Sequence, residues 1–133
     1  MNCRLNAQDD IEEIAQLLEK YGADSLQITK PSSPQHFRKG SKDKKILVEI
    51  SNKIARSVNI PVILGGGLSD MTSINELINT TDIDFISIQR PFVFNPTFLS
   101  QWKDGREVES LCHTCNNCYW KKTSTCHIIA EDE

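Results

Sequence analysis

The sequence lacks a strong charge of either sign and any long apolar run. Its 133 residues carry 15 Lys and Arg against 18 Asp and Glu, a net charge of −3, with no long block of one sign. Proteins that bind nucleic acid usually present a basic surface, so we predict no nucleic-acid partner. No apolar run approaches the roughly 20 residues of a membrane-spanning helix, and the first residues lack the apolar core of a signal peptide. The sequence therefore predicts a cytoplasmic protein with no membrane partner.

The chain is also short for a large fold. A whole (β/α)8 barrel needs roughly 250 residues, about twice the present length.

Five cysteines are present, and four of them are crowded near the C-terminus. An odd number arranged in this way is a poor framework for disulfides, so we interpret the cysteines first as thiols.

Apolar residues recur with strand and helix periods that alternate along most of the chain. The expected strands are residues 2–5, 25–29, 60–64 and 85–88. The expected helices are residues 9–21, with Tyr21 on the core face, then 43–57, 70–79 and 96–102. Such alternation is typical of parallel strands joined by right-handed helical crossovers, and four β/α units are half of an eightfold barrel. We therefore predict an α/β fold with a half-barrel domain at 1–105 and a Cys-rich tail domain at 106–133.

Two neighbouring strands end in residues that suit an anion. Gly65, Gly66 and Gly67 let the backbone approach a ligand with no side chain in the way, and they lead toward a helix N-terminus. The next strand ends at Gln89 and Arg90, which places a permanent positive charge at the same edge of the sheet. Taken alone, Arg90 is better interpreted as a surface or ion-paired arginine. Together with the glycines it predicts a phosphate-binding site, because the last loops of an eightfold barrel are its usual phosphate site.

Three segments resemble the old yellow enzyme family of FMN-dependent (β/α)8-barrel oxidoreductases. Pro61–Leu68 and Asp84–Phe92 resemble that family's strands seven and eight, and Cys3–Asn6 is similar to its strand five. The resemblance implies parallel (β/α) units that form the C-terminal half of a TIM barrel, with a Cys-rich C-terminal tail. It also implies FMN as the cofactor, bound by Arg4 near the flavin ring and by a phosphate grip at Gly65, Gly66, Gly67, Gln89 and Arg90.

The resembled enzymes pass a hydride from NADH or NADPH through FMN to an activated alkene or a similar acceptor. Their substrate-binding pair and proton-donating tyrosine lie in the N-terminal half, and nothing in this chain matches them. We therefore assign no catalytic residue, and whether the chain is an enzyme on its own stays open. A half-barrel of this kind implies a homodimer or association with a separate N-terminal half-barrel.

The tail cysteines Cys112, Cys115, Cys118 and Cys126 are spaced C-x2-C-x2-C-x7-C. Thiolates this close together suit zinc or an iron-sulfur cluster. Reduced structural or redox-prone thiols are the interpretation we favour, with a bound metal as the alternative. Cys3, on an expected strand, is interpreted as a core residue.

Three hypotheses of function are open. The first is the FMN-binding half of an NAD(P)H-dependent flavin oxidoreductase that is inactive alone. The second is a non-catalytic half-barrel module that binds phosphate or metal, and the third is a structural fragment with no ligand. Phe92, Phe94 and Phe98 follow the last strand, and core packing is favoured for them over contact with a flavin ring.

Overall fold

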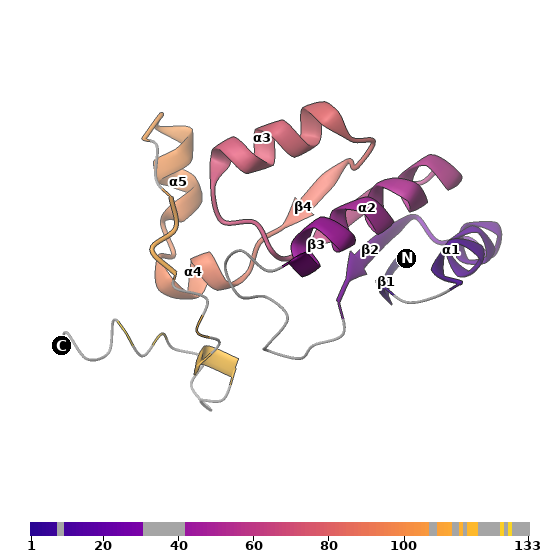
Figure 1. Cartoon of the computed structure of the whole chain (residues 1–133), viewed down its shortest axis with the longest axis horizontal. Helices are drawn as coiled ribbons and strands as arrows, with labels where there is room; N and C mark the ends of the chain where they lie inside the picture. Colours follow the sequence, from indigo (N-terminus) through magenta and orange to yellow (C-terminus); the bar gives the residue numbers. More distant parts are fainter. Residues whose placement is uncertain are drawn as a thin grey trace.

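Strands and helices alternate through the chain, as Figure 1 shows. The computed structural model describes residues 1–7, 10–30, 42–106, 109–112, 115, 117–119, 126 and 128. The strands are β1 (Asn2–Asn6), β2 (Ser25–Thr29), β3 (Val62–Gly65) and β4 (Phe85–Ser87). The helices are α1 (Ile11–Lys20), α2 (Lys42–Ser57), α3 (Met71–Thr80), α4 (Arg90–Phe94), α5 (Phe98–Lys103) and the 3-10 turn η2 (Asn117–Tyr119).

The four strands form one parallel sheet in the order β1-β2-β3-β4. Its register aligns Asn6, Thr29, Gly65 and Ser87 at the edge where the strands end. Sequential parallel strands joined by helices are the arrangement of a (β/α)8 barrel. The predicted fold class is therefore confirmed, and the chain is a parallel α/β partial barrel.

The two faces of the sheet differ in what covers them. Side chains alternate between the faces, and one face packs on the helices to form the core. The largest fully buried side chains of this core are Leu26, Ile28, Leu47, Ile54, Val62, Leu64 and Phe98. The opposite face, which we call the inner face, carries Arg4, Gln27, Ile63 and Phe85 at one level of the register. Phe85 is 57% exposed there, so the inner face is open to solvent at β4.

Two details of the helices differ from the sequence-based expectation. Tyr21 lies just beyond α1 and is 75% exposed, so its predicted place on the core face is wrong. Gly22 follows in the left-handed region with φ of 93° and turns the chain out of the helix. The helix expected at 96–102 is α5, whereas α4 before it was not expected, and Asn95 with its extended backbone separates the two. No helix among the described residues is long and apolar enough to cross a membrane.

Aromatic side chains join α4 and α5 to the core. The Phe98 ring contacts Phe92 edge-on at 6.2 Å between centroids and Trp102 at 4.2 Å. Phe98 is 1% exposed. Packing, the role favoured for Phe92 and Phe98, is therefore confirmed.

Ser51 of α2 is fully buried, and its hydroxyl has no hydrogen-bond partner within the described part of the chain. A buried polar group without a partner costs roughly 1–3 kcal/mol, so we expect Ser51→Ala to leave the free energy of unfolding unchanged or to raise it by about 1 kcal/mol. Ser57→Ala is the control, because that hydroxyl donates to the Ile54 carbonyl at 2.9 Å. Urea denaturation of both variants checks this, and a loss of stability in Ser51→Ala would contradict it.

Candidate phosphate-binding site

The three glycines at the end of β3 are required for two different reasons. Gly66 and Gly67 have φ of 94° and 83°, values that side chains other than glycine rarely adopt. Gly65 lies in the strand itself, where a Cβ atom would overlap the Thr29 methyl carbon and lie 3.1 Å from the Ile28 carbonyl oxygen. Gly65 is thus required by close packing of β2 on β3, whereas Gly66 and Gly67 are required by the bend.

The backbone N–H groups of this turn differ in whether they already have an acceptor. The Gly66 N–H donates to the Ser87 carbonyl at 3.1 Å and so continues the β3–β4 ladder. Gly66 therefore serves the shape of the turn and offers no donor. The next three N–H groups, those of Gly67, Leu68 and Ser69, have no acceptor in the part of the chain that the structure describes. Successive N–H groups in a tight turn form an anion-binding concavity.

The N-terminus of α3 is already occupied by a side chain of the protein. Asp70 is the N-cap, and its Oδ1 accepts the Ser73 N–H at 2.7 Å. The sequence suggested that an anion would bind at this helix end, but the Asp70 carboxylate takes that place. The donors available to a ligand are therefore those of the turn at 67–69.

Arg90 lies at the same edge of the sheet as the turn. It is the first residue of α4, and only 9% of its surface is exposed. The alternative interpretation was a surface or ion-paired arginine, and this burial excludes the exposed surface arginine but not the ion-paired one. Gln89, the residue before it, is exposed at the N-cap position. The structure therefore brings Gly67 and Arg90 to one edge, as the sequence predicted, with Gln89 pointing to solvent beside them.

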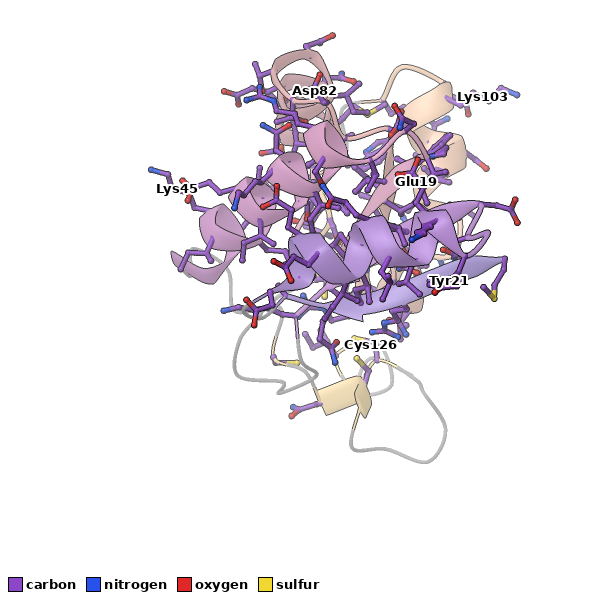
Figure 2. The ribbon with its side chains drawn as sticks, turned by 90° about the vertical axis from the view of Figure 1, so that its right-hand side faces the viewer. Glu19, Tyr21, Lys45, Asp82, Lys103 and Cys126 are labelled. Carbon is purple, nitrogen blue, oxygen red and sulfur yellow. The ribbon has the colours of Figure 1, made fainter. Side chains whose placement is uncertain are left out.

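A hydrogen bond joins the tail to the glycine turn, and the sequence did not predict this contact. The Ser110 N–H donates to the Ser69 carbonyl at 3.1 Å, and Ser110 is 8% exposed. The Cys112 N–H in turn donates to the Ser110 hydroxyl oxygen at 3.2 Å. Figure 2 shows Asp82 and Cys126 at opposite ends of the molecule. Asp82 comes just before β4 begins, so Cys126 lies toward the end at which the strands finish. The predicted boundary between 1–105 and 106–133 stays a prediction.

Burial raises the pKa of the Cys118 thiol, and the neighbouring thiol of Cys112 raises it further. The guanidinium charge of Arg90 acts in the opposite direction, which places Arg90 near the tail. None of the described cysteines forms a disulfide. No group of three His, Cys, Asp or Glu side chains able to hold a metal occurs among the described residues. The described residues therefore give no support to zinc or an iron-sulfur cluster in the tail.

We expect Cys118 to react slowly with iodoacetamide near neutral pH. The thiolate is the reactive form, and a raised pKa keeps the thiol protonated until the pH is higher. Mass spectrometry of the alkylated protein, folded and urea-unfolded, measures the rate at each cysteine. Cys115 is the control, because its side chain is exposed. Equal rates at Cys118 in the folded and unfolded chain would contradict the prediction.

Arg4 lies apart from the glycine turn, on the inner face of β1. Its Nε–H donates to the Thr29 hydroxyl oxygen at 3.3 Å. Thr29 is 4% exposed, and its methyl group packs against Gly65. The sequence predicted Arg4 as a ligand-binding residue but not Thr29, which joins Arg4 to β3. The alternation of β2 alone gave no signal for this contact, because it depends on the register between strands.

A protein-family comparison covers most of the chain. Residues 2–113 match the model of the family described as Histidine biosynthesis protein. The matched range includes all four strands, the glycine turn and Arg90.

The individual relatives are described as the imidazole glycerol phosphate synthase subunit HisF. The imidazole glycerol phosphate synthase subunit HisF of Prochlorococcus marinus strain MIT 9515 is 31% identical over 97 residues, which are 73% of this chain and 35% of that protein. The HisF subunit of Flavobacterium johnsoniae is 31% identical over 91 residues, or 68% of this chain and 34% of that protein. The HisF subunit of Prochlorococcus marinus strain AS9601 is 33% identical over 76 residues, or 57% of this chain and 28% of that protein. The chain thus spans about a third of the length of the curated relatives it matches.

These matches overturn the resemblance to old yellow enzymes. The predictions of a flavin oxidoreductase, of FMN as cofactor and partner, and of NADH or NADPH as reductant are wrong. The homodimer and the separate N-terminal half-barrel were inferred from that flavoenzyme half, and they are withdrawn with it. The loops after the last strands are the usual phosphate site of many barrels, so a glycine turn and an arginine there do not identify the family or the rest of a ligand. The chain belongs to the histidine biosynthesis protein family.

Proposed function

We propose that this chain provides a phosphate-binding part of a barrel enzyme of histidine biosynthesis, with a ligand of the imidazole glycerol phosphate kind. The three N–H groups of Gly67, Leu68 and Ser69, which have no acceptor among the described residues, are the observation that carries this proposal. The relatives named above are called subunits of imidazole glycerol phosphate synthase, so association with a second subunit is part of the proposal. A cytoplasmic location is part of it too.

Each part of the site has a distinct role toward a phosphate. The turn supplies neutral N–H donors close to the ligand, because Gly67 has no side chain to cover them. Arg90 supplies a positive charge in a buried place where water screens it little. The Asp70 carboxylate keeps the phosphate at the turn and away from the end of α3.

We expect Arg90→Gln to weaken phosphate binding about 10- to 100-fold, because a hydrogen bond to a charged group contributes roughly 1.5–3 kcal/mol. Calorimetric titration of the full chain with imidazole glycerol phosphate, and with inorganic phosphate, measures this change. Ligand-induced shifts in melting temperature give a second measurement.

Arg56→Gln is the matched control for charge. Arg56 is exposed and pairs with Asp82 at 2.7 Å, at the edge where β4 begins, far from the turn. Its loss should leave phosphate binding unchanged. Circular dichroism shows whether each variant is folded, and Arg90→Lys retains a charge if Arg90→Gln is unstable. Equal affinity of wild type and a folded Arg90→Gln would contradict the proposal.

A further inference from the structure

The glycine turn is held by the backbone at both of its ends. At the first end, the Gly66 N–H donates to the Ser87 carbonyl at 3.1 Å. At the second end, the Ser69 carbonyl accepts the Ser110 N–H at 3.1 Å. Between these two points the Leu68 side chain is 4% exposed and belongs to the core. The tail therefore supplies the hydrogen bond that holds the second end of the turn.

The glycines make this turn dependent on such a hydrogen bond. Gly66 and Gly67 both adopt positive φ, and a glycine populates the other backbone regions about as readily. A turn that is not held would have to order its backbone when a ligand binds, and this loss of conformational freedom weakens binding. A hydrogen bond beyond the glycines orders the turn before the ligand arrives.

Ser110 is itself held in place within the tail. It is 8% exposed, and its hydroxyl oxygen accepts the Cys112 N–H at 3.2 Å. A serine that binds the N–H two residues later forms a local turn and so restricts its own backbone. The Ser110 side chain therefore orients the backbone whose N–H reaches Ser69.

The tail also lies near the charged part of the site. Burial raises the pKa of the Cys118 thiol, the Cys112 thiol raises it further, and the guanidinium charge of Arg90 lowers it. Charges act strongly only over short distances, so Cys118 lies near Arg90. Ser110 and Cys118 thus lie near the two parts of the phosphate site, which are the turn and Arg90.

We infer that Ser110 of the tail is a positioning residue of the phosphate site, which holds the glycine turn in the shape that presents its N–H groups to a ligand. The inference rests on the proposed phosphate-binding function and adds the tail to that site. Ser110 acts through Ser69 and does not itself contact the phosphate.

A proline at position 110 tests the hydrogen bond directly, because proline has no N–H. We expect inorganic phosphate to bind the full-length Ser110→Pro variant about 10-fold more weakly than the wild type. Calorimetric titration measures this at a temperature where circular dichroism shows both proteins folded. Ser110→Thr keeps the N–H and the hydroxyl and should bind as the wild type does. Leu111→Pro is the control, because Leu111 is 66% exposed and its N–H makes no hydrogen bond in the described part of the chain.

A measurement on the wild type tests the same link from the other direction. Coupling between two sites is reciprocal, so saturating phosphate should slow hydrogen exchange at the Ser110 amide by the same factor, about 10-fold. The Thr81 amide is the control, because it donates to the Leu77 carbonyl at 3.0 Å at the far end of α3. Its exchange rate should stay unchanged.

Several outcomes would overturn the inference. One is equal phosphate affinity of the wild type and a folded Ser110→Pro, and another is an equal loss of affinity in Leu111→Pro. If Ser110→Pro does not fold, the exchange measurement decides, and an unchanged rate at the Ser110 amide overturns the inference.

Failure of the wild type to bind phosphate contradicts the proposed function alone. The role of Ser110 is then decided without a ligand, by nuclear magnetic resonance relaxation of the Gly67 and Ser69 amides. Their order parameters should be lower in Ser110→Pro than in the wild type, or in Ser110→Ala if the proline variant is unfolded. Unchanged order parameters would show that Ser110 does not hold the turn.

Discussion

Gly65→Ala is expected to lower the free energy of unfolding by about 1–3 kcal/mol, the usual cost of overfilling a packed region. The new Cβ atom would overlap the Thr29 methyl carbon and lie 3.1 Å from the Ile28 carbonyl oxygen. The backbone oxygen is held in the β2–β3 ladder and cannot move aside without disturbing the sheet. Urea denaturation followed by circular dichroism measures the change.

A second substitution separates this clash from a general effect of alanine. Thr29→Ser removes the methyl carbon but keeps the hydroxyl that accepts from Arg4. It should recover part of the stability lost in Gly65→Ala, with a coupling of about 1 kcal/mol in the double-mutant cycle. Gly67→Ala is the control, since its Cβ would meet only Lys44 Cγ at 3.6 Å and its cost comes from φ of 83°. If Thr29→Ser rescues Gly67→Ala equally well, the contact between Gly65 and Thr29 is not the cause.

Phe98→Ala should cost about 3–5 kcal/mol, the usual loss when a buried aromatic side chain is truncated. Phe98 is 1% exposed and joins Phe92 of α4 to Trp102 of α5. Since α4 begins at Arg90, the cavity would also loosen the helix that carries the charge of the phosphate site. We therefore expect weaker phosphate binding even at temperatures where the variant remains folded.

The neighbouring leucine provides the control for Phe98. Leu99 is in the same helix and is 52% exposed. Leu99→Ala should change stability by no more than about 0.5 kcal/mol. Thermal unfolding and phosphate titration of both variants check these expectations. A loss of less than about 1 kcal/mol in Phe98→Ala would show that α5 contributes little to the core.

The sequence predicted the elements better than their ends and contacts. Ser25–Thr29 was expected as a strand with the bounds that β2 has, because a short apolar segment stands there between turn residues. Tyr21 was misplaced, since apolar spacing continues past the residue at which the backbone leaves the helix. The contact between Thr29 and Gly65 could not be predicted, because it joins residues whose alignment depends on strand register.

The sequence also predicted a phosphate-binding site at this edge of the sheet, but it predicted the wrong family. Glycine and arginine indicate local features, namely a tight bend and a fixed positive charge, and many barrels have both features. The availability of individual N–H groups depends on the fold. The Gly66 N–H already donates to the Ser87 carbonyl, whereas the Ser69 N–H has no acceptor among the described residues. Similar bends can therefore present different donors to a ligand.

The linear order of the strands has a consequence for how the protein folds and opens. Each strand pairs only with its neighbours along the chain, and Asn2 pairs with Ser25, Leu26 with Val62 and Ile63 with Phe85. Such mostly short loop closures favour rapid folding by successive addition of β/α units. Among the strands that the structure describes, only β2 and β3 have a strand on both sides. Amide hydrogens of this central pair should exchange with solvent last, so the strand that leads into the glycine turn also belongs to the most persistent part of the sheet.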